Sequence, residues 1–372
     1  MSDSAPQAIQ GPVLVIGAGL IGASIGQALA RAGVEVWLRD VDQTQVNTAV
    51  AMGAGQAFES MKGERRTPQL VVVAVPPRFA ARVIADASFE FPESVITDVT
   101  SVKSNILKQA IAFGADESRL VGGHPMAGRE VSGAAAARKD LFDDRLWIIT
   151  ALESSSSSSQ NLVEKLALSC GAIAVKMTVH EHDQAVALVS HAPQVVSSAL
   201  AAQLLPAHEH HIAVAGQGLR DMTRIAASDN ALWVDILSEN AAPVAEVLGG
   251  LVAELQEVLH ALQDLANGDE DHAKILDATL RAGTQGRARI PGRHGNVEAA
   301  FSQVAVLIED KPGELARLFV AAGDAGINLE DVRIEHVLGR PSGLVELSVR
   351  PDRAQELTDA LASQKFDVKG VS

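Results

Sequence analysis

The sequence is poor in cysteine and tyrosine: Cys170 is the one cysteine among 372 residues, and tyrosine is absent. A single cysteine cannot form an intramolecular disulfide, which is typical of a reducing compartment, so we expect a cytoplasmic protein. Residues 1–10 have no basic start and no apolar stretch and do not resemble a signal peptide. Cys170 follows an apolar run, and we interpret it as a small packed residue rather than a nucleophile.

Basic residues are outnumbered, since 31 Lys and Arg face 46 Asp and Glu and the formal net charge is −15. Such a surface repels phosphate, so neither nucleic acid nor an anionic membrane is an expected partner. An anionic substrate would need a local group of Arg or Lys. The charge-free run Val13 to Ala30 is long enough to suggest a membrane span, but its glycines favour a strand, a turn and a helix in succession.

Short apolar runs alternate with helical patterns over the first 150 residues. Strands are expected at 12–16, 34–38, 70–75, 94–99 and 146–150, with helices between them, for example at 20–32 and 102–113. This alternation predicts an α/β domain with a Rossmann-like, doubly wound parallel sheet. The serines at 154–159 predict a solvated loop.

The character of the chain changes near residue 178, where strand signals vanish and an all-helical domain is predicted. Its longest stretch, 231–265, contains Pro243 and Gly249–Gly250, where we expect interruptions. Large apolar helix faces favour pairing with a second copy, so a homodimer is expected. From Ser302 the strand pattern returns as a small α+β unit of βαββα(β) order.

These patterns divide the chain into four segments. We expect a dinucleotide-binding domain over 11–178, a helical substrate and dimerisation domain over 179–284, a linker over 285–300 and a regulatory domain over 301–372.

The glycine-rich turn Gly17-Ala-Gly-Leu-Ile-Gly22 is the first motif that carries chemistry. It follows a predicted strand and opens a predicted helix, which is the setting of a dinucleotide-binding turn. The alternative is a glycine turn without a ligand. We expect contacts to the cofactor from Gly17, Gly19, Leu20, Ile21, Gly22, Asp40 and Pro76.

Asp40 ends the second predicted strand at the spacing of a ribose-binding acid. A carboxylate there repels a 2′-phosphate, which favours NAD and makes NADP the less favoured cofactor. Arg39 beside it could instead hold that phosphate, and Asp40 could simply cap the next helix.

Three further segments are rich in polar residues, Gly and Pro: TDVTSVKSNI at 97–106, GGHPMAGREVSG at 122–133 and LRDMTRIA at 219–226. Together with the glycine turn and the C-terminal unit, they resemble the prephenate and arogenate dehydrogenases. The resemblance covers about residues 11–350, and the pairing of HPMAG with RDMTRIA is specific. It implies an NAD-dependent oxidative decarboxylation in tyrosine biosynthesis, with prephenate giving 4-hydroxyphenylpyruvate.

The resemblance also implies roles for individual residues. His124 would act as the base for the ring hydroxyl, and Ser101 would bond the imidazole or that hydroxyl. Arg224 would hold a substrate carboxylate. The remaining substrate-binding positions it implies are Glu130, His191, Gln194 and Trp233.

Each of these residues has a plainer interpretation. His124 could be a loop residue bonded to backbone, Arg224 could pair with a neighbouring acid, and Trp233 could be core packing. Lys103 could start a helix or touch substrate or cofactor. The family often has a second histidine where this chain has Gln194, so arogenate stays open as the substrate.

The histidines at 208, 210 and 211 follow Pro206 without the spacing of ligands on one helical face, so no metal site is expected. His180 and His182 likewise begin a helix without a metal partner.

The C-terminal unit resembles an ACT domain, a ferredoxin-like fold that binds amino-acid effectors. The resemblance implies an effector site at Asp310, Gly313 and Asn328, most simply for tyrosine. A purely structural dimerisation domain is the alternative for this unit.

For the whole chain, the alternative to an enzyme is a non-catalytic sensor of NAD and amino acids. A β-hydroxyacid dehydrogenase would need a catalytic lysine in the helical domain, for which we see no convincing candidate.

Overall fold

The computed structural model describes residues 9–58, 67–128, 131–290, 301–336 and 342–371. They belong to two compact units, 1–252 and 253–372. The division falls within a long helix, so the four domain bounds expected from the sequence stay predictions.

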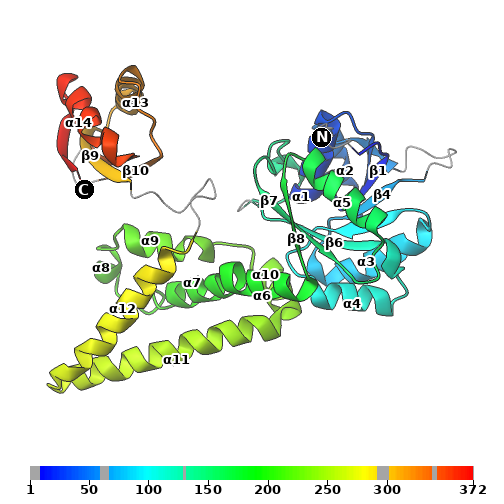
Figure 1. Cartoon of the computed structure of the whole chain (residues 1–372), viewed down its shortest axis with the longest axis horizontal. Helices are drawn as coiled ribbons and strands as arrows, with labels where there is room; N and C mark the ends of the chain where they lie inside the picture. Colours follow the sequence, from blue (N-terminus) through cyan, green and yellow to red (C-terminus); the bar gives the residue numbers. More distant parts are fainter. Residues whose placement is uncertain (1–8, 59–66, 129–130, 291–300, 337–341, 372) are drawn as a thin grey trace, which may run out of the picture. The chain divides into compact units, whose positions relative to one another are not determined.

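The first unit contains an eight-stranded sheet with strand order β3-β2-β1-β4-β5-β6-β7-β8 (Figure 1). The strands are β1 (Val13–Ile16), β2 (Val36–Arg39), β3 (Gln56–Ala57), β4 (Leu70–Val73), β5 (Val95–Asp98), β6 (Leu120–Pro125), β7 (Leu146–Ala151) and β8 (Ile173–Met177). The six strands β1 to β6 are all parallel, which confirms the doubly wound arrangement.

The prediction of a parallel strand at 146–150 was wrong, because β7 pairs antiparallel with β6. Two parallel neighbouring strands need a crossover connection between them, which is usually a helix. The described part of the connection from β6 to β7 holds only the single turn Ala134–Ala136, so the chain reverses instead. β8, which the sequence pattern did not reveal, then pairs parallel with β7.

Helices cover both faces of this sheet (Figure 1). One apolar core packs helices α1 (Leu20–Arg31), α2 (Gln43–Ala51) and α5 (Ser157–Ser169) on the sheet. The other packs α3 (Pro77–Glu90) and α4 (Ser104–Ala112) on the opposite face. Ile236 of the helical region joins this second core, which ties that region to the sheet domain.

The serine run at 154–159 is not a solvated loop. Ser156 caps α5 by accepting a hydrogen bond from the backbone N–H of Ser159, and Ser155 and Ser159 are buried. Serine is a favoured helix cap because its hydroxyl satisfies an unpaired N–H of the first turn.

The chain is helical from residue 179 to residue 287 apart from short connections. The helices are α6 (Val179–Val186), α7 (Ala192–Ala202), α8 (Glu209–Ile212), α9 (Gln217–Thr223), α10 (Asn230–Glu239), α11 (Ala241–Ala266) and α12 (Ala273–Arg287). The predicted interruption near Pro243 and Gly249–Gly250 was misplaced. The break lies at Asn240, between α10 and α11, where the axis bends by 95°.

Helix α12 continues to Arg287, so it extends into the segment 285–300 that was predicted as a linker. Glycine weakens a helix interior by about 1 kcal/mol without ending it, and the next proline, at position 291, comes only later. Residues 291–300 lie outside the described part of the chain.

A π-helical turn at Ala187–His191 joins α6 and α7 into one helix, Val179–Ala202. By length and composition alone it could cross a membrane, a property it shares with core helices of soluble proteins. His182, Asp183 and His191 on it are buried and hydrogen-bonded. These hydrogen bonds hold one face of the helix within this unit, while only 33% of its 18-residue apolar window is buried.

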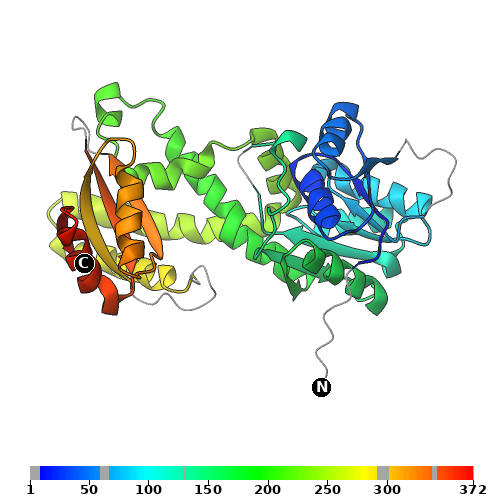
Figure 2. The same ribbon diagram turned by 90° about the horizontal axis from the view of Figure 1, so that it is seen from above.

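The C-terminal part of the second unit has the predicted βαββαβ order: β9 (Ser302–Glu309), α13 (Glu314–Asp324), β10 (Asp331–His336), β11 (Ser342–Val349), α14 (Ala354–Ser363) and β12 (Asp367–Val371). Its antiparallel sheet has strand order β10-β11-β9-β12, and Figure 2 shows α13 lying against it. Alternate residues of β9 (Val304, Val306 and Ile308) face the core shared with α13 and α14.

Candidate active site

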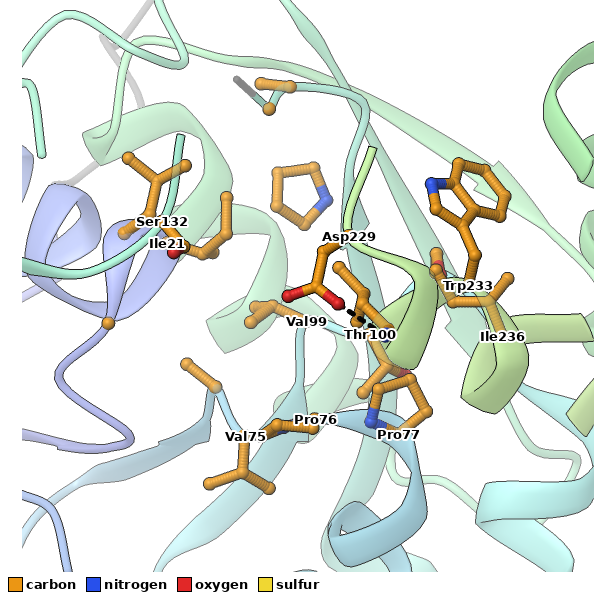
Figure 3. A pocket seen from close by; sticks show the side chains of 18 of the residues that line it. Ile21, Val75, Pro76, Pro77, Val99, Thr100, Ser132, Asp229, Trp233 and Ile236 are labelled. Carbon is orange, nitrogen blue, oxygen red and sulfur yellow. Dashed lines mark hydrogen bonds between the residues drawn. The ribbon is translucent and has the colours of Figure 1, made fainter. Parts of the chain in front are cut away.

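A cavity of about 740 Å³ opens at the carboxyl ends of β1, β4, β5 and β6. Open α/β sheets bind ligands at this edge. Figure 3 shows Ile21 and Ser132 on one side and Trp233 and Ile236 of α10 on the other, with Asp229 between them. The main lining residues are Gly19, Leu20, Ile21, Val75, Pro76, Thr100, Ser101, His124, Ser132, Asp229, Trp233 and Ile236.

The glycine turn has the geometry of a phosphate cradle. Gly17 has φ +103°, a conformation that L side chains rarely adopt, and a Cβ on Gly22 would overlap the carbonyl oxygen of Gly17. A Cβ on Gly19 would meet nothing within 4 Å, so the open side of the turn is the side from which a ligand can approach the backbone. The first turn of α1 has neither a capping side chain nor an acidic residue, so its N–H groups can bind an anion.

Asp40 connects the end of β2 to this turn. Its Oδ2 accepts a hydrogen bond from the backbone N–H of Ala18 at 2.6 Å, and its Oδ1 accepts one from Asp42 N–H at 2.9 Å. The alternative that Asp40 caps the next helix is wrong, because Asp42 caps α2 by accepting from Thr44 N–H.

Arg39 is engaged away from the cofactor turn. Its guanidinium makes two bonds of 2.7 Å to Glu90 and stacks over the Phe58 ring at 4.4 Å. Holding a 2′-phosphate would require it to leave these partners.

His124 lies near the end of β6 and lines the cavity. Its Nδ1 is 2.8 Å from Nε2 of His182 on α6. Burial, together with the nearby Lys103 charge, lowers the pKa of His124 well below its usual range. The ring is therefore neutral at neutral pH, as a general base must be.

Ser101 lines the cavity with His124, and Nδ1 of the His124 ring is bonded to His182. Ser101 stays a prediction as a partner of Nε2 or of the substrate hydroxyl.

Of the two interpretations of Lys103, the structure supports the helix start, because Lys103 is the N-cap residue of α4 and is not among the residues that line the cavity. It is fully buried, and its ammonium bonds Asp98, Thr100 Oγ1 and the Thr100 carbonyl oxygen. Burial lowers the pKa of Lys103, and the Asp98 charge opposes that shift.

The predicted substrate residues of the helical region lie at different places. Trp233 lines the cavity, and its ring and that of His191 make a T-shaped contact with 6.0 Å between centroids. His191 is buried against Asn240, and burial lowers its pKa to about 4. Gln194 is also buried, and neither it nor Arg224 belongs to the cavity lining.

Glu130, the remaining predicted substrate residue, lies outside the described residues.

None of the described residues that line the cavity is Lys or Arg. Among the described residues no group of three or more His, Cys, Asp or Glu could hold a metal ion. Burial raises the pKa of the Cys170 thiol, which fits its interpretation as an inert packed residue.

Two of the three effector residues expected in the C-terminal unit lie in one hollow, and the third does not. Asp310 and Gly313 line a hollow of about 190 Å³ in front of α13. Asn328 instead donates a hydrogen bond to Glu330 at 2.8 Å and is not part of that hollow.

Two regions of the chain match known protein families. Residues 25–176 match "Prephenate dehydrogenase, nucleotide-binding domain", and residues 178–278 match "Prephenate dehydrogenase, dimerization domain". The chain belongs to the prephenate dehydrogenase family. The family resemblance predicted from the four motifs is thereby confirmed.

Similar proteins of this family span most of the chain. The probable prephenate dehydrogenase NovF of Streptomyces niveus is 36% identical over 95% of this chain and 98% of its own length. The prephenate dehydrogenase of Bacillus subtilis is 27% identical over 94% of this chain and 96% of its own length. Among solved structures, the prephenate dehydrogenase of Aquifex aeolicus in complex with hydroxyphenyl propionate and NAD⁺ has a TM-score of 0.64 at 26% identity, over 73% of this chain and 97% of that one.

Sequence reasoning missed His182 and Asp183, although it noted that His182 begins a helix. The available signal was the adjacent pair of histidine and aspartate after the capping residue Thr178. Nothing local indicates that His182 meets His124, which is 58 residues away in the sequence.

Proposed function

We propose that this member of the prephenate dehydrogenase family converts prephenate and NAD to 4-hydroxyphenylpyruvate, CO₂ and NADH in tyrosine biosynthesis. The observation that carries the proposal is the placement of His124 in one cavity with the glycine turn at Gly19. A ligand bound to that turn would therefore share its cavity with a neutral imidazole.

When bound, NAD supplies the acceptor for the hydride that leaves the ring carbon bearing the hydroxyl. His124 Nε2 accepts the hydroxyl proton, so that a carbonyl forms as the hydride leaves. Loss of the ring carboxylate as CO₂ then makes the ring aromatic. The product is a phenol, so the proton returns to the same oxygen and His124 ends the cycle neutral.

The cavity favours this chemistry by excluding water from one side of the substrate. Trp233 and Ile236 of α10 and Val75 and Pro76 after β4 form apolar walls. A dry site strengthens the hydrogen bond between His124 and the hydroxyl, because competing water is absent.

The anchor for the substrate carboxylates stays a prediction. Arg224 is the residue that the family resemblance implies, with Glu130, His191 and Gln194 as further contacts. Arg224 begins a short turn, Arg224–Ala226, that precedes the cavity residues Ser228 and Asp229 in the chain.

We further propose a homodimer formed through the helical domain, which matches the family's dimerization domain. Several large apolar side chains of this domain are exposed in the single chain, for example Leu188 at 61% and Val189 at 63%. Exposed apolar groups of this kind favour burial against a second copy.

The βαββαβ unit is proposed to be an ACT-like domain that binds an amino-acid effector such as tyrosine. In support, Gly313 has φ +95°, stands directly before α13 and lines a hollow together with Asp310. Backbone N–H groups at the start of a helix suit a carboxylate.

The direct test is NADH formation by the purified chain with prephenate and with arogenate as separate substrates. Faster turnover of prephenate, with 4-hydroxyphenylpyruvate as product, supports the proposal. Preference for arogenate, with tyrosine as product, would replace prephenate as the substrate, and turnover of neither would refute the assignment.

A further inference from the structure

Two buried, titratable side chains, those of His182 and Asp183, continue from His124 as a hydrogen-bonded chain. His124 Nδ1 is 2.8 Å from His182 Nε2, and His182 Nδ1 is 2.8 Å from Asp183 Oδ1. The two rings meet edge to face, with an angle of 71° between their planes. His182 is fully buried and Asp183 is 2% exposed, so water does not compete for these bonds.

The carboxylate of Asp183 is held in place from α4. Its Oδ1 accepts a hydrogen bond from Lys103 N–H at 2.9 Å, and its Oδ2 accepts one from Ser104 N–H at 2.7 Å. Asn240 donates to the backbone carbonyl oxygen of Asp183 at 2.9 Å. Burial alone would raise the pKa of Asp183, but the bonds from His182 and Ser104 outweigh it and the pKa is lowered.

These contacts determine where the protons of both rings lie. An ionised carboxylate can only accept, so His182 must carry its hydrogen on Nδ1. The Nε2 of neutral His182 is then an acceptor, and His124 must donate to it from its own Nδ1. The one lone pair left on the His124 ring is at Nε2, the atom that the proposed reaction uses as base.

Other charges surround this chain of residues and contribute to its titration. Lys103 at the start of α4 lowers the pKa of both His124 and His182, while Asp98 at the end of β5 raises that of His182. His191 on the π-helical turn also lowers the pKa of His124.

We propose that His182 and Asp183 are positioning residues for His124, which hold its ring in the Nδ1–H tautomer and share the proton that it takes from the substrate. When His124 Nε2 accepts that proton, its Nδ1 proton can move to His182 Nε2, and the positive charge then lies beside the Asp183 carboxylate. The reverse movement restores the phenol proton. This inference rests on the proposed function, since it assigns helpers to the same base.

A merely structural role for His182 would affect folding and leave the pH dependence of turnover unchanged. Three variants separate the two roles. His182→Gln keeps an acceptor for His124 Nδ1–H but cannot take a proton. Asp183→Asn removes the negative charge that fixes the Nδ1–H tautomer of His182 and that would stabilise its protonated ring. His180→Gln changes an exposed histidine of the same helix, α6, and serves as the matched control.

The tautomers can be measured without turnover. Nitrogen NMR of the full chain with ¹⁵N-labelled histidine, with signals assigned by their loss in His124→Asn and His182→Gln, distinguishes Nδ1–H from Nε2–H. The expected result is Nδ1–H for both rings in the wild type. Nε2–H for His124 in the wild type would overturn the proposal, whether or not any variant folds.

Steady-state kinetics across pH complete the test. We expect kcat to fall about 10-fold in His182→Gln and on the order of 100-fold in Asp183→Asn, with KM changed little and the acid limb of the kcat profile displaced. His180→Gln should match the wild type. Unchanged kcat and an unchanged pH profile in a folded His182→Gln would overturn proton sharing. If the wild type oxidises neither prephenate nor arogenate, the proposed function fails, and the NMR result still decides the hydrogen-bond chain.

Discussion

The Asp40 carboxylate and the backbone N–H of Ala18 are joined by a hydrogen bond of 2.6 Å, which fixes the end of β2 against the cofactor turn. We expect this carboxylate to lie beside the ribose of the bound cofactor, where it would repel a 2′-phosphate. Arg39, the residue that could favour NADP, is instead paired with Glu90.

Asp40→Ser should weaken the preference for NAD over NADP. Removing the carboxylate removes both a ribose acceptor and a source of repulsion, so we expect kcat/KM with NAD to fall about 10-fold or more while NADP gains relative to it. Steady-state kinetics with the two cofactors measure the ratio. Asp42→Asn is the matched control, since Asp42 caps α2 and its loss should leave cofactor choice unchanged. An unaltered ratio in Asp40→Ser would contradict this role.

Lys103→Met should destabilise the first unit strongly. The substitution leaves Asp98 as a buried charge without its cation, which costs about 3–5 kcal/mol. Lys176→Met is the control, because the Lys176 to Glu164 pair is exposed and such pairs contribute about 1 kcal/mol or less. Urea unfolding followed by tryptophan fluorescence reports on this unit alone, since Trp37, Trp147 and Trp233 all belong to it. An equal decrease in the free energy of unfolding in the two variants would argue against a buried ion pair.

Acid should destabilise the same unit through its buried histidines. Folding lowers the pKa of His191 from 6.5 to about 4, and it also lowers those of His124 and His182. The unfolded chain therefore binds more protons, so the stabilisation is complete above pH 6.5 and is lost as the pH falls toward 4. For His191 alone the loss at pH 5 is roughly 1–2 kcal/mol.

Tryptophan-detected urea unfolding at several pH values checks this. His191→Asn should show a shallower decline between pH 7 and pH 5 than the wild type, because one titrating group is gone. Parallel curves for the two proteins would contradict the assignment to His191.

Much of the fold follows from local patterns, because buried parallel strands are short apolar runs and the glycine turn marks where β1 meets α1. The reversal at β7 and the break at Asn240 were not predictable in this way, since both depend on which surfaces pack together. The cofactor-binding residues of the site could also be predicted from local sequence. The partners of His124 could not, because His182 and Asp183 reach it only through the packing of α6 beside the sheet.

Gly313→Ala should reduce the response to an amino-acid effector without changing activity in its absence. At φ +95° an alanine is strained, so the backbone at the start of α13 must shift. Gly323→Ala, in the last turn of the same helix with open space around its Cβ, is the matched control and should keep the response. Inhibition by tyrosine is the measurement. If a chain ending after Asn296 remains as sensitive as the full chain, the C-terminal unit is not the sensor.

The central claim is that His124 is the base of a prephenate dehydrogenase, and His124→Asn tests it most directly. Asparagine keeps a polar group near the end of β6 but cannot take the hydroxyl proton. We predict that kcat for prephenate-dependent NADH formation falls by about 10²- to 10⁴-fold, while NAD still binds with wild-type affinity by fluorescence titration. A kcat within a few-fold of the wild type in the folded variant would contradict the account.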